Sequence, residues 1–188
     1  MFKGSRIALS ALMLCFVMLM SGCNSNRNEG RINGLANAHY SARYYTLEMH
    51  QGTMPGEETI LISSLNELKE WHKHTFNEWD NSFDWNTFST DTAKYLKQGF
   101  NNFLAQILEN YLECFFENNQ IILLPRLVAR VAEWFAIPSI NYYNSTLSIN
   151  MRIRRPWGGM YDLGASSIGV IEISRISTDL NIELNISR

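Results

Sequence analysis

Residues 96–124 read LKQGFNNFLAQILENYLECFFENNQIILL, and the fold depends on a change of hydrophobic period inside this stretch. In its first part the apolar residues recur at i, i+4, i+7, i+8, i+11 and i+12, which predicts a helix with one apolar face. In its last part Ile121 to Leu124 form a continuous apolar run, which predicts a buried strand. The helix is expected to begin at Thr90 or Asp91 and to end near residues 117–119. Gly99 lies inside it, where it costs about 1 kcal/mol, and we expect it to allow close packing.

A shorter helix and two strands are predicted on the N-terminal side of this stretch. Ser64 and Glu67 fit a capping box, so a helix should run from there to about Glu78. Residues 42–49 and 59–63 have strand character, and Pro55-Gly56 marks a turn between them.

The C-terminal side consists of strand patterns joined by short links. Strands are expected at residues 131–142, 146–153, 168–174 and 180–187, with a turn at Asn144-Ser145 and a bulge or sheet edge at Pro138. Two-faced strands with short links favour an antiparallel sheet. The sequence therefore predicts an α+β domain at residues 39–188. It would contain about five to seven antiparallel strands, one long and one shorter helix on one face, and a helical insertion at about residues 76–110.

The composition excludes several classes of protein. Of the 188 residues 46% are hydrophobic and 18% are charged, which rules out wholesale disorder. The net charge of -2 offers no electrostatic basis for a nucleic-acid partner. Three cysteines cannot form a disulfide scaffold.

The N-terminus carries a targeting pattern. Lys3 and Arg6 precede an apolar run at residues 7–20, which is shorter than the roughly 20 residues of a membrane span. Ser21-Gly22-Cys23 follows directly, and this pattern resembles the lipobox of bacterial lipoproteins, with Met20 at a position where the family prefers Leu. The resemblance implies that the signal peptide (residues 1–22) is cleaved and that Cys23 carries lipid. The alternatives are an ordinary secretory signal and an uncleaved anchor.

Residues 24–38 are polar and rich in Asn, so residues 23–38 are expected to form a flexible tether between the lipid and the domain. The protein would then be attached through the Cys23 lipid to the bacterial cell membrane or outer membrane, facing the periplasm or the exterior. If Cys23 is lipidated, Cys114 has no partner in the mature chain, and we expect it to be a small buried side chain beside Phe115.

A second resemblance covers roughly residues 58–186. The segment YLECFFENNQIILL at residues 111–124 is similar to a pattern in small, mostly uncharacterised lipoproteins of Gram-positive bacteria, in which Tyr-x-x-x-Phe-Phe-x-x-Asn leads into an apolar strand. Those proteins are remotely similar to the C-terminal domain of the protease-complex subunit PrcB family. The resemblance implies a non-catalytic, surface-tethered domain and transfers no functional residue.

Motifs of catalysis and metal binding are weak. The sequence has no Cys-x-x-Cys and no His-Glu-x-x-His, and residues 164–169 (GASSIG) miss the spacing of a serine-hydrolase elbow. His72 and His74 lie two positions apart on a helix and cannot share a metal. Residues 80–91 have the outline of a calcium loop, but Trp85 replaces the required glycine and Asp91 the bidentate Glu. We therefore interpret the loop as a polar connection with helix caps, and no cofactor is predicted.

Two regions are candidates for interaction with a partner. Trp79 and Trp85 belong to an aromatic-rich segment that is either a small satellite core or a surface for a partner or glycan. The second region is a glycine-containing loop whose side chains are typical of interface anchors. The alternative is a plain connection between strands. The candidate interaction residues of this loop are Arg154, Arg155, Trp157 and Tyr161.

The sequence thus favours a lipid-anchored binding or accessory protein of the cell surface, without catalytic activity, whose partner is an envelope or secreted protein. A lipoprotein enzyme, most plausibly a hydrolase, is the alternative from another class. A structural envelope protein without a small ligand is the third hypothesis.

Overall fold

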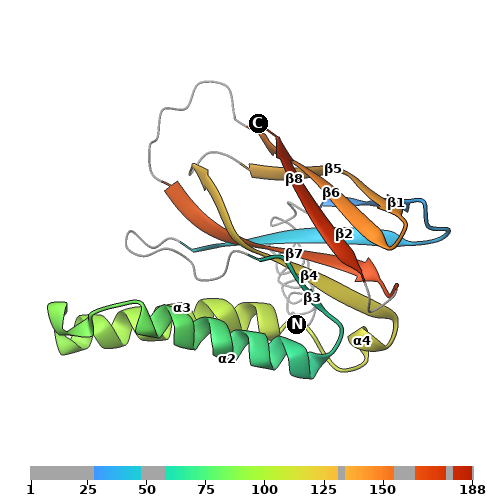
Figure 1. Ribbon diagram of the computed structural model, residues 1–188. Coiled ribbons are helices and arrows are strands. Elements are labelled where there is room, and N and C mark those ends of the chain that lie inside the picture. The colour runs from blue at the N-terminus through green and yellow to red at the C-terminus, as the bar shows by residue number, and fades with distance from the viewer. Residues whose placement is uncertain (1–27, 48–57, 131–133, 155–163, 177–179, 188) are drawn as a thin grey trace, which may run out of the picture.

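The computed structural model of the chain describes residues 28–47, 58–130, 134–154, 164–176 and 180–187 (Figure 1). The described residues form eight strands, three α-helices and one short 3-10 helix, η1. The order along the chain is β1 (Asn28–Asn33), β2 (His39–Leu47), β3 (Ile60–Ile62), α2 (Leu65–Asn81), η1 (Trp85–Thr87), α3 (Thr90–Leu108), α4 (Phe115–Asn118), β4 (Asn119–Arg130), β5 (Trp134–Tyr143), β6 (Thr146–Arg154), β7 (Gly164–Ser174) and β8 (Asn181–Ser187).

All eight strands belong to one sheet of order β3-β4-β7-β2-β1-β5-β6-β8. The α+β class is confirmed, but the prediction of an entirely antiparallel sheet is wrong for two pairs, because β1 lies parallel to β5 and β6 lies parallel to β8. Hairpin links between neighbouring strands suggest only antiparallel pairs. The parallel pairs join strands far apart in sequence, which local patterns do not reveal.

The sheet folds over on itself at β1. One half, called half A, contains β3, β4, β7 and β2; the other, half B, contains β5, β6 and β8. The first residues of β1 pair with β2 and its last two pair with β5, so β1 joins the halves. Figure 1 shows half B rising at an angle above half A, with the helices below half A.

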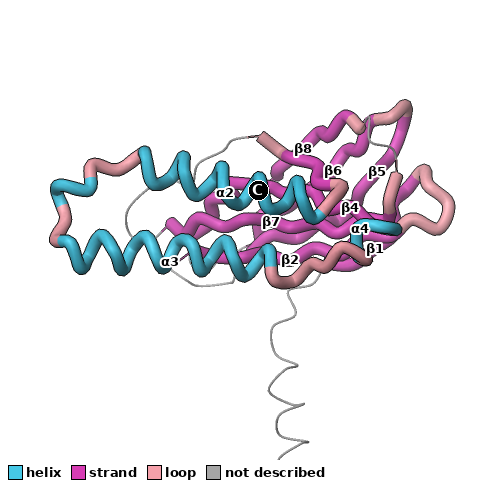
Figure 2. The backbone as a smooth tube through the Cα atoms, turned by 90° about the horizontal axis from the view of Figure 1, so that it is seen from below, coloured by secondary structure: helices cyan, strands magenta, loops and turns pink. Residues whose placement is uncertain are grey.

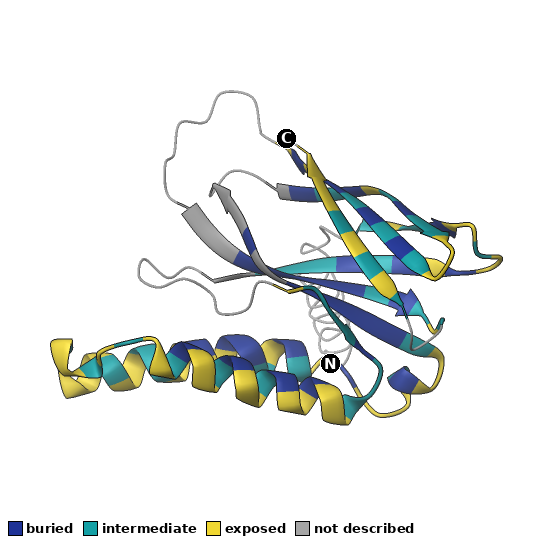
Figure 3. Cartoon of the chain, in the orientation of Figure 1, coloured by how far each residue is buried: buried dark blue, intermediate teal, exposed yellow. Residues whose placement is uncertain are grey.

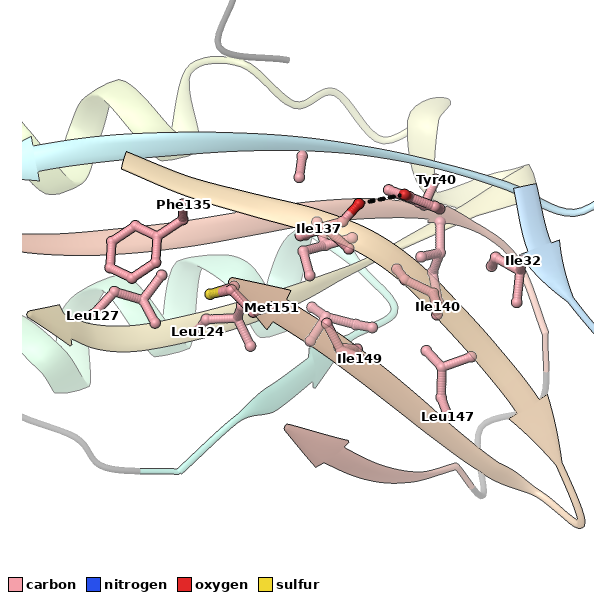
Figure 4. Close-up of a cluster of buried hydrophobic side chains, with 14 of the residues drawn as sticks. Ile32, Tyr40, Leu124, Leu127, Phe135, Ile137, Ile140, Leu147, Ile149 and Met151 are labelled. Carbon is pink, nitrogen blue, oxygen red and sulfur yellow. Dashed lines mark hydrogen bonds between the residues drawn. The ribbon is translucent and has the colours of Figure 1, made fainter. Parts of the chain in front are cut away.

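Two apolar cores result from this arrangement. The inner core lies between the halves, and its members Ile140, Leu147 and Ile149 are fully buried (Figure 4). The second core lies between half A and the helices and includes Trp79, Phe100 and Leu104. Alternate residues of the half A strands therefore point into different cores, and both faces of these strands are covered in part (Figure 3).

Helices α2 and α3 form an antiparallel hairpin along half A, and its tip extends past the strands (Figure 2). The predicted cap at Ser64 is confirmed, because Glu67 N donates to Ser64 Oγ at 3.1 Å. The return bond of a capping box differs, since Glu67 Oε2 accepts from Ser63 N at 2.6 Å rather than from the N–H of Ser64. The two helices have 17 and 19 residues, so they are of nearly equal length rather than one long and one shorter. The shorter helix begins at Leu65, as predicted, and extends to Asn81, three residues beyond its predicted end.

The longer helix ends earlier than the period of its hydrophobic residues predicts. Helix α3 stops at Leu108, and a turn leads to the separate short helix α4. Tyr111 continues the apolar stripe in sequence but turns into the second core, with 3% of its surface exposed. Leu112, which the stripe places on the apolar face, is 68% exposed.

The predicted tether at residues 23–38 is wrong over its described part. Residues 28–33 form β1, and Ile32 and Ala38 belong to the inner core. The turn after β1 depends on Gly34, which has a φ of 88° and would place a side chain 2.2 Å from the carbonyl oxygen of Tyr142. A polar, Asn-rich composition concealed this strand, because only one face of β1 is buried.

Two local predictions in half B are confirmed. Asn144 and Ser145 have φ angles of 48° and 60°, as a two-residue hairpin between β5 and β6 requires. The register of β5 with β6 shifts between Ala136 and Ser139, which places the irregularity at Pro138.

Two predictions about small residues are wrong. Cys114 is exposed and not a buried hydrophobe, because it precedes α4 on the solvent side of the turn. Gly99 does not serve close packing, since a side chain at this position would meet no atom within 4 Å.

Candidate binding groove

A polar strip lies on the helix-facing side of half A, over β1 and β2, where neither α2 nor α3 fully covers the sheet. Helix α4 borders this strip, since its residue Phe115 lines the same pocket as Glu29 and Arg31. A pocket of about 510 Å³ is found here, lined mainly by polar side chains of four strands and by Phe115 of α4. We refer to this pocket as the groove.

The strand registers arrange the polar side chains of the groove in two rows across the sheet. The first row is Glu29 on β1, Ser41 on β2 and Glu172 on β7, which are direct partners in register. The second row is Arg31, His39, Ser174 and Asn119, on β1, β2, β7 and β4. Members of one row are about 4.8 Å from their neighbours, and the rows are about 6.6 Å apart along the strands.

Glu172 is the centre of the first row. Its Oε1 lies 3.0 Å from Nη2 of Arg43 and accepts a hydrogen bond of 3.1 Å from the hydroxyl of Tyr111. Burial raises the pKa of Tyr111 above its usual value, and the charge of Glu172 raises it further. The phenol therefore stays protonated and donates, and the carboxylate is held by a cation and a neutral donor.

Two polar atoms beside Glu172 have no hydrogen-bond partner. They are Oγ of Ser41 and Nε of Arg43, both buried within the described part of the chain. A buried donor or acceptor without a partner costs about 1–3 kcal/mol, so such atoms are uncommon in folded proteins. Hydrogen bonds to a bound molecule or to water would remove this cost.

The apolar wall of the groove is held by aromatic contacts. The ring of Phe115 meets Tyr111 edge-on with centroids 4.9 Å apart, and it contacts Phe116 at 5.1 Å. Phe116 and Tyr111 are buried in the second core. The wall therefore has a fixed position relative to Glu172, which favours a preformed site.

The two rows give the groove a mixed charge pattern. Glu29 and Glu172 place carboxylates in one row, whereas Arg31 and His39 place basic groups in the other. Glu29 and Arg31 are exposed charged residues of the groove, and Arg43 pairs with Glu172. This arrangement is suited to a ligand with a cationic and an anionic group about two residues apart on an extended chain.

The groove does not assemble a nucleophile with a base. His39 and Ser41 are alternate residues of β2 on the same face, but no hydrogen bond between their side chains is found in the described residues. The backbone N of His39 donates to Ser174 Oγ at 3.3 Å, and Glu172 contacts Arg43 rather than His39. Serine catalysis needs a base that both contacts the hydroxyl and is oriented by a carboxylate.

The interpretation of Trp79 as a partner-binding residue is wrong. Trp79 is 1% exposed and stacks on Phe100 with ring centroids 4.2 Å apart. Trp85 is half-buried at the hairpin tip, where its Nε1 donates to the carbonyl of Asp80 at 2.8 Å and Lys97 Nζ lies 4.6 Å from its ring centroid. The aromatic segment belongs to the second core and closes its end at the tip of the helical hairpin.

The loop at residues 80–91 is a polar connection with helix caps, as we interpreted it. Asp84 caps η1 by accepting from Asn86 N at 3.1 Å, and Asp80 pairs with Lys97 at 2.7 Å. Ser89 caps α3, one residue before the predicted start. The described residues contain no cluster of three or more side chains suited to a metal ion.

The structure describes only one of the remaining candidate residues. Arg154 is the exposed last residue of β6. Arg155, Trp157, Tyr161 and Cys23 lie outside the described residues, so their roles stay predictions. No helix in the described ranges combines the length and the apolar character that crossing a membrane requires.

The groove itself was not predicted, although the sequence contains two signals for it. Glu172 is a lone carboxylate inside the apolar run of β7, and a buried acid in a strand usually has a partner. His39, Ser41 and Arg43 alternate along β2 and therefore share one face. Neither signal names the partner strand, which is set by registers between distant segments.

Comparisons with protein-family models, with curated protein sequences and with solved structures find no match to this chain.

Proposed function

We propose that this chain is a lipid-anchored binding or accessory protein of the bacterial cell surface, which holds an extended segment of an envelope or secreted protein in the groove. The anchor part of the proposal depends on the lipobox pattern, Ser21-Gly22-Cys23 after an apolar run. Two or three acyl chains hold a protein on a bilayer at about 0.8 kcal/mol per buried methylene.

The observation that carries the binding part is the pair of charged rows beside Ser41 Oγ, a buried polar atom without a hydrogen-bond partner on a residue that lines the groove. A peptide backbone supplies both donors and acceptors for such atoms, and its side chains at i and i+2 match the spacing of the rows. Phe115 adds an apolar wall against which the segment can pack.

The same geometry supports binding more than hydrolysis, the alternative function. Glu172 is occupied by Arg43 and Tyr111, and Ser41 lacks a contact with His39. A general base has to lie within hydrogen-bond reach of the proton that it removes. Hydrolysis would need a rearrangement that brings His39 to Ser41, whereas peptide binding needs none.

The groove is tested by titration with three capped pentapeptides that differ only in charge: Ser-Lys-Ser-Asp-Ser, Ser-Lys-Ser-Lys-Ser and Ser-Asp-Ser-Asp-Ser. Binding is followed by NMR shifts of the purified, isotope-labelled chain. The mixed-charge peptide should bind about fivefold more tightly than either of the others, because it can pair with both Glu29 and Arg31. Shifts should be largest at β1, β2 and the turn at residues 109–114.

Variants separate the groove from nonspecific attraction. Arg31→Gln and Glu29→Gln should each reduce the affinity for the mixed peptide severalfold, whereas Lys69→Gln, at an exposed position on α2, should leave it unchanged. Equal affinity for all three peptides, or an equal effect of Lys69→Gln, would refute the groove as the binding surface.

The anchor is tested independently by metabolic labelling with a fatty acid. The wild-type chain should acquire label and Cys23→Ser should not, because the thioether to diacylglycerol cannot form without the thiol. Cys114→Ser is the matched control and should keep the label, since Cys114 is the exposed free thiol of the folded domain. Label on Cys23→Ser would contradict the lipoprotein assignment and would leave the groove proposal standing.

A further inference from the structure

Strand β8 is the terminal strand of half B. It pairs with β6 over its whole length, from Thr146 opposite Asn181 to Arg152 opposite Ser187. Within the described residues no strand pairs with its other edge (Figure 1). The opposite end of the sheet is β3, which has only three residues, so β8 is the longer open edge.

The open edge of β8 presents backbone groups at alternate residues. Asn181 N donates to the carbonyl of Ser145 at 2.9 Å, so Asn181 is directed toward β6. In a parallel ladder alternate residues direct both their N–H and C=O to the same neighbour. Ile182, Leu184 and Ile186 therefore direct their N–H and C=O groups away from β6, into the open edge.

This edge lacks the features that normally prevent strand pairing. Its sequence, NIELNIS, contains no proline and no lysine or arginine, and its register with β6 has no shift. Ile186 is 49% exposed. Exposed, regular edge strands of this kind pair readily with further strands.

The sequence of β8 is self-complementary about Leu184. In an antiparallel pair of two β8 strands centred on Leu184, Ile182 lies opposite Ile186 and Glu183 opposite Asn185. The outward backbone groups then form hydrogen-bonded pairs at Leu184 with Leu184 and at Ile182 with Ile186. A pair centred on Glu183 would instead set two carboxylates opposite each other, which is unfavourable.

We propose that two copies of this chain associate through β8, antiparallel and centred on Leu184, so that their half B sheets become continuous across a two-fold axis. The contact is isologous, because each copy contributes the same strand. The inner-face residues Ile182 and Ile186 extend the apolar surface across the junction. On the outer face Glu183 lies beside Ser148 and Asn185 beside Asn150. The groove is on half A and takes no part in this contact.

The register makes a charge test possible at Asn185, an exposed position. Asn185→Lys should strengthen the dimer about three- to tenfold, because it places a lysine opposite Glu183 of the other copy at two symmetric positions. Asn185→Glu should weaken the dimer by a similar factor through two pairs of like charges. Dissociation constants are measured by sedimentation equilibrium of the full chain in mild detergent at several protein concentrations.

Asn102→Lys and Asn102→Glu, at an exposed position on α3, are the matched controls and should leave the dissociation constant unchanged. Ile186→Pro removes an outward donor without removing a bond to β6, and it should abolish the dimer while the circular dichroism spectrum is retained. A monomer at all concentrations, or a dimer unaffected by either change at Asn185, overturns the proposal. A weaker dimer for Asn185→Lys also overturns the proposal, because the two lysines would then lie opposite each other, in a register other than the one centred on Leu184.

Discussion

The hydroxyl of Tyr111 donates a hydrogen bond of 3.1 Å to Oε1 of Glu172, which lies 61 positions away in the sequence. This contact joins the turn after α3 to the middle of half A. Arg43 Nη2 approaches the same oxygen at 3.0 Å. The hydrogen bond from Tyr111 thus links the aromatic wall of the groove to its central carboxylate.

We expect Tyr111→Phe to destabilise the domain by about 1–3 kcal/mol. The substitution keeps the buried ring but removes the donor to a charged acceptor, and hydrogen bonds to charged groups fall in this range. Urea denaturation followed by circular dichroism measures the change. Tyr143→Phe is the control, since Tyr143 is 76% exposed and should be neutral. A neutral Tyr111→Phe would mean that water replaces the hydroxyl.

The stability of the domain should fall at alkaline pH. Burial and the Glu172 charge raise the pKa of Tyr111 above its usual value of 10.0, so above that pH the unfolded chain loses a proton that the folded chain retains. The contribution is fully present below pH 10 and is lost as the pH rises toward the raised pKa. Urea titrations at a series of pH values should show a flatter alkaline decline for Tyr111→Phe; identical slopes would contradict this origin.

Trp79 and Trp85 should respond very differently to truncation. Trp79→Ala should cost about 3–5 kcal/mol, because the fully buried ring stacks on Phe100. Trp85→Ala should cost less, since its ring is half-buried at the hairpin tip. Thermal and urea unfolding measure both. A loss below about 1 kcal/mol for Trp79→Ala would mean that this ring does not pack between α2 and α3 as described.

Gly99→Ala should stabilise the domain by about 0.5–1 kcal/mol. Gly99 lies within α3, and an added methyl group meets no atom within 4 Å, so the helix propensity of alanine is gained without a clash. Gly169→Ala is the opposite case, because its methyl would lie 2.8 Å from Leu127 Cδ1 and 3.2 Å from Leu124 Cβ. The two melting temperatures should move in opposite directions.

The sequence by itself determined the features that depend on neighbouring residues. The helix cap at Ser64, the turn at Asn144-Ser145 and the irregularity at Pro138 are set by local backbone chemistry, and all three are present. The apolar stripe of α3 and the strands from Asn119 onward follow from the hydrophobic period, because the spacing of apolar residues indicates which face of an element is buried.

The tertiary structure alone decided how these elements meet. Strand β1 has the composition of a linker and is ordered by pairing with β2 and β5, more than 100 positions away in the second case. Tyr111 leaves the helical stripe because the second core and Glu172 stabilise it more than another helical turn would. The groove exists only because registers place Glu29, Ser41 and Glu172 in one row. A local pattern records which face of an element is buried, whereas the partner of that face is chosen by packing of the whole chain.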